Sequence, residues 1–304
     1  MSLFVQQQQI ADPFVLEVVD RPEPHAGPGE VRVRVRAAGL NPVDWKIASN
    51  PAAAHAFGVT LPAGFGNDLA GEIDEVGDGV TGWAVGDRVY GGARGRAVAE
   101  HVVLDPATLL RTPHGLPDEI AATLQIAGRT ADAAVHAVRV GAGDTVLIGG
   151  AAGGVGVLTV QLAVAAGATV IATASPDNHD FLRSLGAVPT TYGDGLADRV
   201  RALAPDGVDA AIDLHGTDTV RTALELGVPG DRIATIAGGP NPPGGAIATG
   251  GGDATPGALD RIAAGLAAGT LQLPIAARFP IERITDAVAL QRTGHVRGKV
   301  VVTI

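Results

Sequence analysis

The segment Thr145-Val-Leu-Ile-Gly-Gly-Ala-Ala-Gly-Gly-Val-Gly156 decides the expected fold. A short apolar run ends at Ile148, the glycines follow, and a helix is predicted from about residue 155. Glycines at such a junction permit a sharp turn and let backbone N–H groups approach a pyrophosphate, which the helix N-terminus also attracts. Against the fingerprint G-x-G-x-x-G, Ala151 replaces the first glycine, and Gly153 and Gly156 fill the other two. The turn is therefore interpreted as a dinucleotide-binding site.

The sequence around this turn predicts alternating strands and helices. Strands are expected at 145–149, 169–174, 208–213 and 231–236, and helices near 155–166, 177–185, 196–204 and 217–226. Such alternation indicates a parallel sheet covered by helices on both faces, and hence an α/β fold. The Gly- and Pro-rich residues 237–252 are expected to form a flexible loop. A helix from about 256, a strand near 275–279, a helix at 282–292 and a strand at 298–303 are expected to close the chain.

The first third of the chain reads as β-rich. Three valines at 31, 33 and 35 alternate with three arginines at 32, 34 and 36, which is typical of a half-buried strand. Further strands are expected near 70–76, 86–90 and 97–104. Asp118 is expected to cap an Ala-rich stretch that continues through Arg139 as two helices broken near Gly128.

Composition limits the possible function. The 304 residues suggest two domains, and a net charge of −10 argues against a groove for nucleic acid. The chain has no Cys, which excludes disulfides, thiolate nucleophiles and Cys-ligated zinc. Residues 1–9 do not resemble a secretory signal, and glycines interrupt the uncharged stretch between Asp144 and Asp177, so no membrane span is expected. The protein is expected to be cytoplasmic.

The residues after the second strand of this unit favour NADP(H). NAD-binding proteins place an acidic residue there to bind the adenosine ribose, whereas this chain has Ala172-Thr-Ala-Ser175. Ser175, Asn178 and His179 are expected to donate hydrogen bonds to a 2′-phosphate. Asp177 opposes this interpretation unless its side chain points away from the phosphate.

Six segments resemble the medium-chain dehydrogenase/reductase superfamily, specifically its zinc-independent quinone oxidoreductase-like branch. They are Ala38-Gly-Leu-Asn-Pro-Val-Asp-Trp-Lys46, Gly66-Asn-Asp-Leu-Ala-Gly71, Val76-Gly-Asp-Gly-Val-Thr-Gly82, Gly86-Asp-Arg-Val-Tyr90, Ala151-Ala-Gly-Gly-Val-Gly156 and Gly298-Lys-Val-Val301. The resemblance implies a GroES-like catalytic domain (1–115), a Rossmann domain (116–252) and a C-terminal segment (253–304) that returns to the first domain. It also implies a cleft between the two domains, often in a homodimer.

The resemblance also implies roles for individual residues. Zinc-dependent relatives carry a ligand Cys where this chain has Asn41, and a His-Glu pair where it has Asn67-Asp68, so no metal is expected. The substrate side is expected to include Asn41, Asp44 and Lys46, with Asn67 near the nicotinamide. The cofactor residues expected from the turn and the resemblance are Gln125, Thr130, Ala152, Gly153, Gly154, Val155, Gly156 and Tyr192, the last near the adenosine. Asn41 is equally consistent with a turn residue before Pro42, Asp44 with a helix cap, and Tyr192 with a surface residue.

The expected reaction is hydride transfer from NADPH to a small-molecule substrate, a quinone or the β-carbon of an activated alkene. Asn41 or Asn67 would stabilise negative charge on the substrate oxygen, and Lys46 or water would supply a proton. Two departures from the branch leave the substrate open: the loop after Lys46 lacks tyrosines, and residues 237–252 are unusually Gly-rich. An enoyl-thioester reductase is an alternative, because Ala172-Thr-Ala-Ser-Pro176 resembles enoyl-reductase domains of polyketide synthases. A polyketide-tailoring enzyme and an NADPH-binding sensor or structural protein without turnover are further alternatives.

Overall fold

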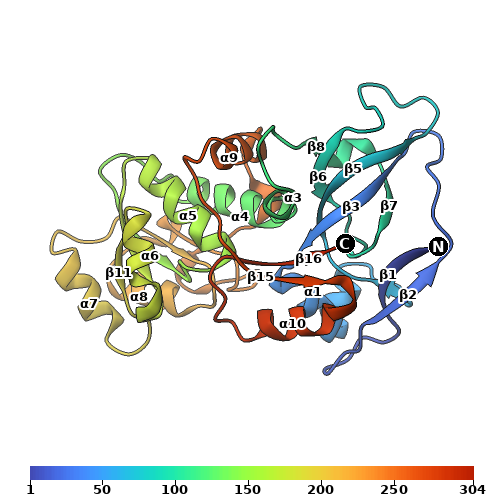
Figure 1. The fold of residues 1–304 in the computed structure, drawn as a ribbon. Helices are drawn as coiled ribbons and strands as arrows, with labels where there is room; N and C mark the ends of the chain where they lie inside the picture. Colours follow the sequence, from blue (N-terminus) through green and yellow to red (C-terminus); the bar gives the residue numbers. More distant parts are fainter. The chain divides into compact units, whose positions relative to one another are not determined.

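Two units make up the computed structural model, which describes residues 1–304 (Figure 1). Unit 1 comprises Met1–Ile126, Ala263–Thr270 and Ile275–Ile304, and unit 2 comprises Ala127–Ile262 and Leu271–Pro274. The first boundary lies inside helix α4 (Leu124–Ala137), whereas the sequence placed a domain boundary after residue 115. None of the helices combines the length and the apolar character that crossing a membrane requires.

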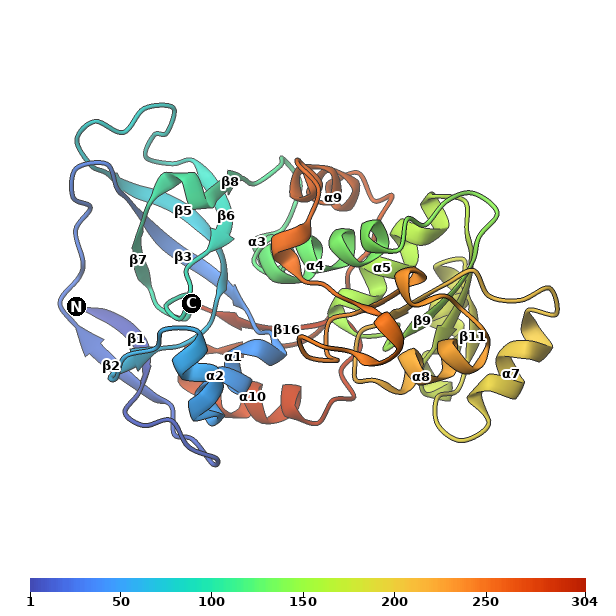
Figure 2. The ribbon, with the colours of Figure 1, turned by 180° about the vertical axis from the view of Figure 1, so that it is seen from behind.

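Unit 2 contains a parallel six-stranded sheet with the strand order β11-β10-β9-β12-β13-β14. Its strands are β9 (Thr145–Gly149), β10 (Thr169–Thr173), β11 (Val188–Thr190), β12 (Ala210–Asp213), β13 (Ile233–Thr235) and β14 (Ile247–Ala248). Its helices include α5 (Gly154–Ala165), α6 (His179–Ser184), α7 (Leu196–Leu203) and α8 (Asp218–Glu225). Figure 2 shows α5 and α8 on opposite sides of β9, so the sheet is covered on both faces as the alternation predicted. Because both faces are covered, β9 and β10 are apolar along almost their whole length.

Two sheets form most of unit 1. A three-stranded sheet has the order β2-β1-β4, and a larger sheet has the order β15-β16-β3-β5-β6-β8 with β7 also paired to β3. The strands are β1 (Ser2–Gln7), β2 (Glu17–Arg21), β3 (Val31–Gly39), β4 (Ala63–Gly64), β5 (Asp68–Val76), β6 (Arg88–Gly92), β7 (His101–Leu104), β8 (Leu109–Arg111), β15 (Ile275–Pro280) and β16 (Lys299–Thr303). The helices are α1 (Pro42–Ser49), α2 (Pro51–Ala56), α3 (Asp118–Ala121) and α10 (Ile284–Arg292), and α9 (Ala258–Ala267) spans the second boundary between the units. The C-terminal strand β16 pairs with β3, so segments far apart in the sequence build this sheet.

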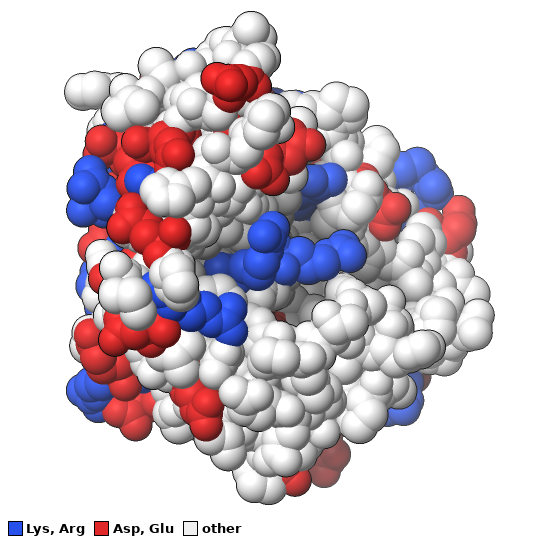
Figure 3. All heavy atoms as spheres, turned by 90° about the vertical axis from the view of Figure 1, so that its right-hand side faces the viewer, with Lys and Arg blue, Asp and Glu red and all other residues white.

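The alternation along β3 has the predicted effect at most positions. The three valines are buried, and Arg34 and Arg36 reach Glu72 on β5 at 3.6 and 3.8 Å. Arg32 departs from the pattern, because it is also buried and binds Asp74 through its Nε at 2.9 Å. On the face drawn in Figure 3, acidic side chains border a central group of basic ones. Both signs of charge therefore occur on that face.

Three local predictions need correction. Asp118 is the first residue of α3 rather than its cap, which is Pro117. The helical stretch breaks at 122–123, and Gly128 lies inside α4, because a single glycine costs a helix only about 1 kcal/mol. The segment 237–252, predicted as a loop, contains the edge strand β14, which pairs with β13.

Candidate functional site

The glycine turn of unit 2 joins β9 to α5, with Gly153 as the helix N-cap. A Cβ atom on Gly156 would lie 2.3 Å from the carbonyl oxygen of Gly150, so the contact between strand and helix excludes any side chain there. A Cβ on Gly153 would meet its nearest atom at 3.5 Å, which is ordinary contact. The fold therefore requires glycine at 156 but not at 153. The space beside Gly153 is left free for a ligand at the N-terminus of α5.

The predicted turn residues lie together. Ala152, Gly153, Gly154, Val155 and Gly156 run consecutively from the turn into the first turn of α5. Gly150 adopts a φ of 71°, in the left-handed region that glycine tolerates best. The loop after β12 borders the same turn, because a Cβ on Gly150 would lie 3.2 Å from the Cβ of His215.

Asp213, the last residue of β12, was not predicted from the sequence. Its Oδ1 accepts hydrogen bonds from the backbone N–H groups of His215 and Gly216, both at 3.2 Å. Its Oδ2 is buried without a partner, and burial raises the pKa of this carboxyl group. The sequence signal was only an acidic residue at the carboxyl end of a buried strand, where ligands of α/β sheets bind.

The residues after β10 form a small polar group. The amide of Asn178 donates to Ser175 Oγ at 3.0 Å, and the ring of His179 lies 3.3 Å from the carbonyl oxygen of Ala174. Because a carbonyl oxygen only accepts, His179 Nε2 is the donor in this contact. The predicted 2′-phosphate residues are thus neighbours, and Asp177 lies exposed between them in the 3₁₀ turn Pro176–Asn178.

Tyr192 lies on an exposed loop that a single arginine holds in place. The guanidinium of Arg199, on α7, donates to the carbonyl oxygens of four successive residues, 191 to 194, at 2.7–3.3 Å. The side chain of Tyr192 is itself 55% exposed. Sequence reasoning missed Arg199, because a lone arginine on a helix carries no motif.

Unit 1 contains a hydrogen-bonded group that we call the polar centre: Asn41, Asp44, Asn67, Asp68 and Lys299. Asn41 caps α1 after the end of β3, Asp68 begins β5, and Lys299 begins β16. All five side chains are buried except that of Asn67, which is partly exposed. Asp68 and Lys299 were not among the predicted site residues.

The side-chain amide of Asn41 is fully used. Its Nδ2 donates to Asp68 Oδ2 at 3.0 Å and to the carbonyl oxygen of Gly39 at 3.3 Å, and its Oδ1 accepts from Lys299 Nζ at 2.6 Å. An amide has two donors, and both are taken. The hypothesis that Asn41 stabilises substrate charge directly therefore loses its geometric basis.

Asn67 differs from Asn41 in this respect. Its Nδ2 donates to Asp44 Oδ1, and its Oδ1 accepts from the N–H of Gly95 at 3.3 Å. One of its two amide hydrogens therefore remains for another acceptor. Asp44 is the third residue of α1 and not its N-cap, which is Asn41, and its Oδ2 accepts from the N–H of Asn41 at 2.7 Å.

Burial governs the electrostatics of the polar centre. It raises the pKa of Asp44 to about 7, with nearby Asp68 acting in the same direction, and it raises the pKa of Asp68 to about 6. Burial lowers the pKa of Lys299, and both carboxylates oppose that change. Oδ1 of Asp68 has no hydrogen-bond partner, so ionisation of this group is costly.

Three further predicted residues, in α1 and α4, also lie outside the polar centre. Lys46 is exposed on α1, with its ammonium 5.8 Å from the centroid of the Trp45 ring. Gln125 lies in unit 1 beside Gly92, whose Cβ would meet Gln125 Cγ at 3.2 Å. Thr130 is buried in the part of α4 that belongs to unit 2.

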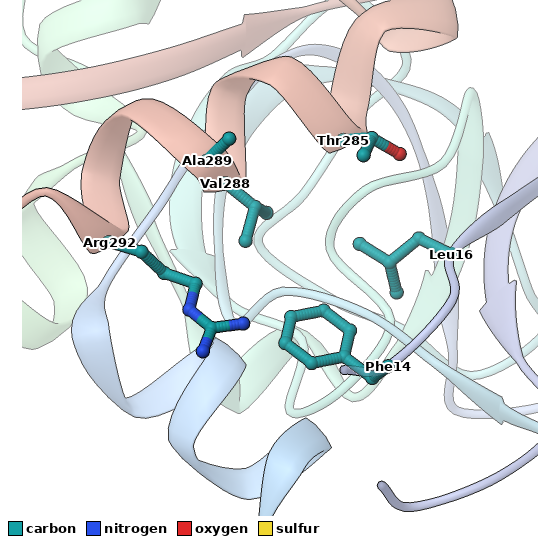
Figure 4. Close-up of a pocket in the computed structure, with 6 residues that line it drawn as sticks. All are labelled: Phe14, Leu16, Thr285, Val288, Ala289 and Arg292. Carbon is teal, nitrogen blue, oxygen red and sulfur yellow. The ribbon is translucent and has the colours of Figure 1, made fainter. Parts of the chain in front are cut away.

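A cavity of about 330 Å³ in unit 1 contains none of the predicted residues. Figure 4 shows Phe14 and Leu16 on one side of it and residues of α10, including Val288 and Arg292, on the other. The guanidinium of Arg292 lies over the rings of Phe14 and Trp45 at 5.6 and 5.4 Å. No group of three or more His, Cys, Asp or Glu side chains is arranged to hold a metal ion.

Comparison with known proteins identifies two family models along the chain. Residues 27–114 match the alcohol dehydrogenase GroES-like domain, and residues 154–249 match the family described as zinc-binding dehydrogenase. A quinone oxidoreductase of Pseudomonas aeruginosa is 35% identical over 80% of this chain and 75% of its own length. The NADPH-dependent alkenal/one oxidoreductase of Arabidopsis thaliana chloroplasts is 31% identical over 90% of this chain and 72% of its own length. The solved structure of the quinone oxidoreductase from Coxiella burnetii has a TM-score of 0.89 at 32% identity, and the match covers 100% of both chains.

Proposed function

Because the chain belongs to the quinone oxidoreductase-like branch of the medium-chain dehydrogenase/reductase superfamily, we propose that it reduces a quinone or an activated alkene with NADPH. The observation that carries the proposal is the glycine turn, where the fold requires glycine at 156 but leaves position 153 open. A turn that was only structural would have no need of the second glycine. The chain is accordingly an oxidoreductase. NADPH as its electron donor and a quinone or activated alkene as its acceptor are proposals.

The residues of unit 2 fit a phosphorylated dinucleotide. The turn from Ala152 to Gly156 would hold the pyrophosphate through backbone N–H groups at the start of α5. Ser175, Asn178 and His179 would take the 2′-phosphate, because no acidic side chain occupies the end of β10. Tyr192, on the loop held by Arg199, would pack near the adenosine. When bound, NADPH supplies the hydride.

In unit 1, the partly exposed Asn67 is the best candidate for contact with substrate. Its unused amide hydrogen would donate to an oxygen on which negative charge develops. Asn41 and Asp44 hold this part of the chain, Asp44 by accepting from both Asn41 and Asn67. These two residues therefore position Asn67 instead of touching the substrate.

The proton would come from Lys46 or from water. If Lys46 is the donor, Lys46→Met should lower kcat by about 10²–10⁴-fold, the usual contribution of a positioned acid. An enone should be affected more than a quinone, whose reduced oxygens take protons from water. NADPH affinity should change little, since Lys46 lies on α1 of unit 1. Parental turnover on every substrate would assign the proton to water.

An NADPH-oxidation assay against benzoquinones, phenanthrenequinone, simple enones and a crotonyl thioester tests the proposed function. Consumption of NADPH with a quinone or enone, unchanged by a chelator, is the expected result. A rate that depends on added zinc would contradict the metal-free reaction. Tight NADPH binding without oxidation in the presence of any acceptor would instead identify a binding protein.

A second candidate is reduction of an enoyl thioester. The segment Ala172-Thr-Ala-Ser-Pro176 favours it, because it resembles enoyl-reductase domains of polyketide synthases and lies at the end of β10. A crotonyl thioester reduced with a higher kcat/KM than any quinone or enone would select this function. Both candidates share the hydride donor and differ in the acceptor.

A further inference from the structure

Lys299 is an unusual lysine because it is 4% exposed. The chain has only one other lysine, the exposed Lys46. A buried ammonium is costly unless charges and hydrogen bonds compensate it. The side chain of Lys299 has both: it donates to Asn41, 258 positions earlier in the sequence, and the charges that act on it are those of Asp68 and Asp44.

The hydrogen bond from Lys299 determines which way the amide of Asn41 faces. If the amide were turned over, its NH₂ group would face the ammonium and its oxygen would face Asp68 Oδ2. Both contacts would then pair like with like, donor with donor and acceptor with acceptor. Lys299 and Asp68 together therefore hold Asn41 in one orientation, in which Asn41 also caps α1.

The charges of the polar centre balance only with a bound proton. One ammonium lies among two carboxyl groups, and Oδ1 of Asp68 has no partner to stabilise an ionised form. If the centre is neutral, Asp44 and Asp68 together carry one proton. Because the two carboxyl groups interact, that proton is assigned to the pair and not to either residue. Asp44, a member of that pair, binds the partly exposed Asn67.

We infer that Lys299 is a positioning residue of the site: its buried ammonium orients Asn41 and sets the protonation of the Asp44–Asp68 pair, in which Asp44 binds Asn67. The inference depends on the proposed function only in its final step, the use of Asn67 by substrate. Lys299 acts through Asn41 and the two carboxyl groups, and it makes no contact with substrate.

The first experiment measures the pKa of the Lys299 ammonium directly. Selective ¹³C labelling of lysine gives two ε-carbon signals, and Lys46→Met assigns the one from Lys299. Removing the negative charge of Asp68 should lower the pKa of Lys299, because that charge favours the ammonium. A pKa at least one unit lower in Asp68→Asn than in the parent is expected. An identical pKa in both proteins would overturn the inference, and Asp44→Asn provides the same test if Asp68→Asn does not fold.

The second experiment uses the pH dependence of kcat. Lys299→Met removes the positive charge, so the pH at which the carboxyl pair titrates should rise by at least one unit. The double variant Lys299→Met/Asp68→Asn restores neutrality and should bring the profile back towards that of the parent. Lys299→Gln keeps a donor for Asn41 without the charge, so it should recover kcat more than Lys299→Met while keeping the shifted profile.

An unshifted profile in Lys299→Met would overturn the inference. The two experiments also separate the two proposals. If no quinone, enone or thioester is reduced, the proposed function fails, while the lysine titration still decides the role of Lys299.

Discussion

The two glycines of the turn have different physical roles, although the fingerprint treats them alike. Gly156 has a packing role, because a Cβ would collide with the backbone of the preceding turn. Gly153 has free space beside it, and its N–H lies at the start of α5. Packing therefore explains the glycine at 156 but not the glycine at 153.

Gly153→Val should weaken NADPH binding and leave the fold intact. The valine methyl groups would occupy the space that a pyrophosphate needs, while no protein atom obstructs the Cβ. Isothermal titration should show at least about a tenfold loss of affinity, and the far-UV circular dichroism spectrum should match the parent's. Gly156→Val is the matched control, because it should lower the melting temperature through overpacking. Normal NADPH binding by Gly153→Val would place the site elsewhere.

The end of strand β10 and the turn after it carry the proposed preference for NADPH. Ala174 and Ser175 stand where an acid would bind the ribose of NAD, and Asn178 and His179 lie beside them. Asp177 is the one anion in the 3₁₀ turn, and it is exposed. Preference for NADPH over NADH should therefore depend on a short segment that can be altered without touching the core.

Asp177→Arg should increase the preference for NADPH over NADH. It removes a negative charge and adds a guanidinium suited to phosphate, a change worth about tenfold in relative affinity. Dissociation constants of both cofactors should be measured for the parent and the variant. Equal constants in the parent would contradict NADPH preference. A ratio unchanged by the substitution would show that residue 177 faces away from the phosphate.

At the level of elements, local pattern predicted unit 2 well. Strand β9 and the start of α7 fall where periodicity placed them, because buried strands and amphipathic helices leave strong local signals. The helix break near Gly128 was misplaced, since packing decides whether a glycine interrupts a helix. The strand β14 was missed because its pairing with β13 is a tertiary contact.

The candidate site could be predicted only in part, for a similar reason. Asn41, Asp44 and Asn67 lie in short motifs, and the structure brings them together. Lys299 joins them from the opposite end of the chain, through the pairing of β16 with β3, and no local pattern reports such a contact. Lys46 was favoured because it lies near these motifs in sequence, yet it is the buried lysine that enters the polar centre.

For the molecule as a whole, the polar centre lowers the free energy of unfolding by an amount that depends on pH. Asp68 is fully buried, and its pKa of about 6 exceeds the value of about 3.9 for an unfolded chain. A carboxyl group with a raised pKa favours folding while it is protonated, and this contribution is lost as the pH rises through its folded-state pKa. Unit 1 therefore retains two buried carboxyl groups that oppose its stability at neutral pH.

Asp68→Asn should make the protein more stable relative to the parent as the pH rises from 5 to 8. The asparagine oxygen can accept from Asn41 and Ile126 as Oδ2 does now, and the side chain never ionises. About half of the shift of roughly two pKa units is expressed between pH 5 and pH 8, because the folded-state pKa is about 6, so the relative gain over this range is about 1.4 kcal/mol. Urea denaturation at both pH values measures it, with Asp180→Asn as the control because an exposed carboxylate paired with Arg183 contributes little. The difference in unfolding free energy between variant and parent could instead stay constant across this range. Asp68 would then be ionised throughout because Lys299 stabilises its carboxylate, and it would carry no exchangeable proton.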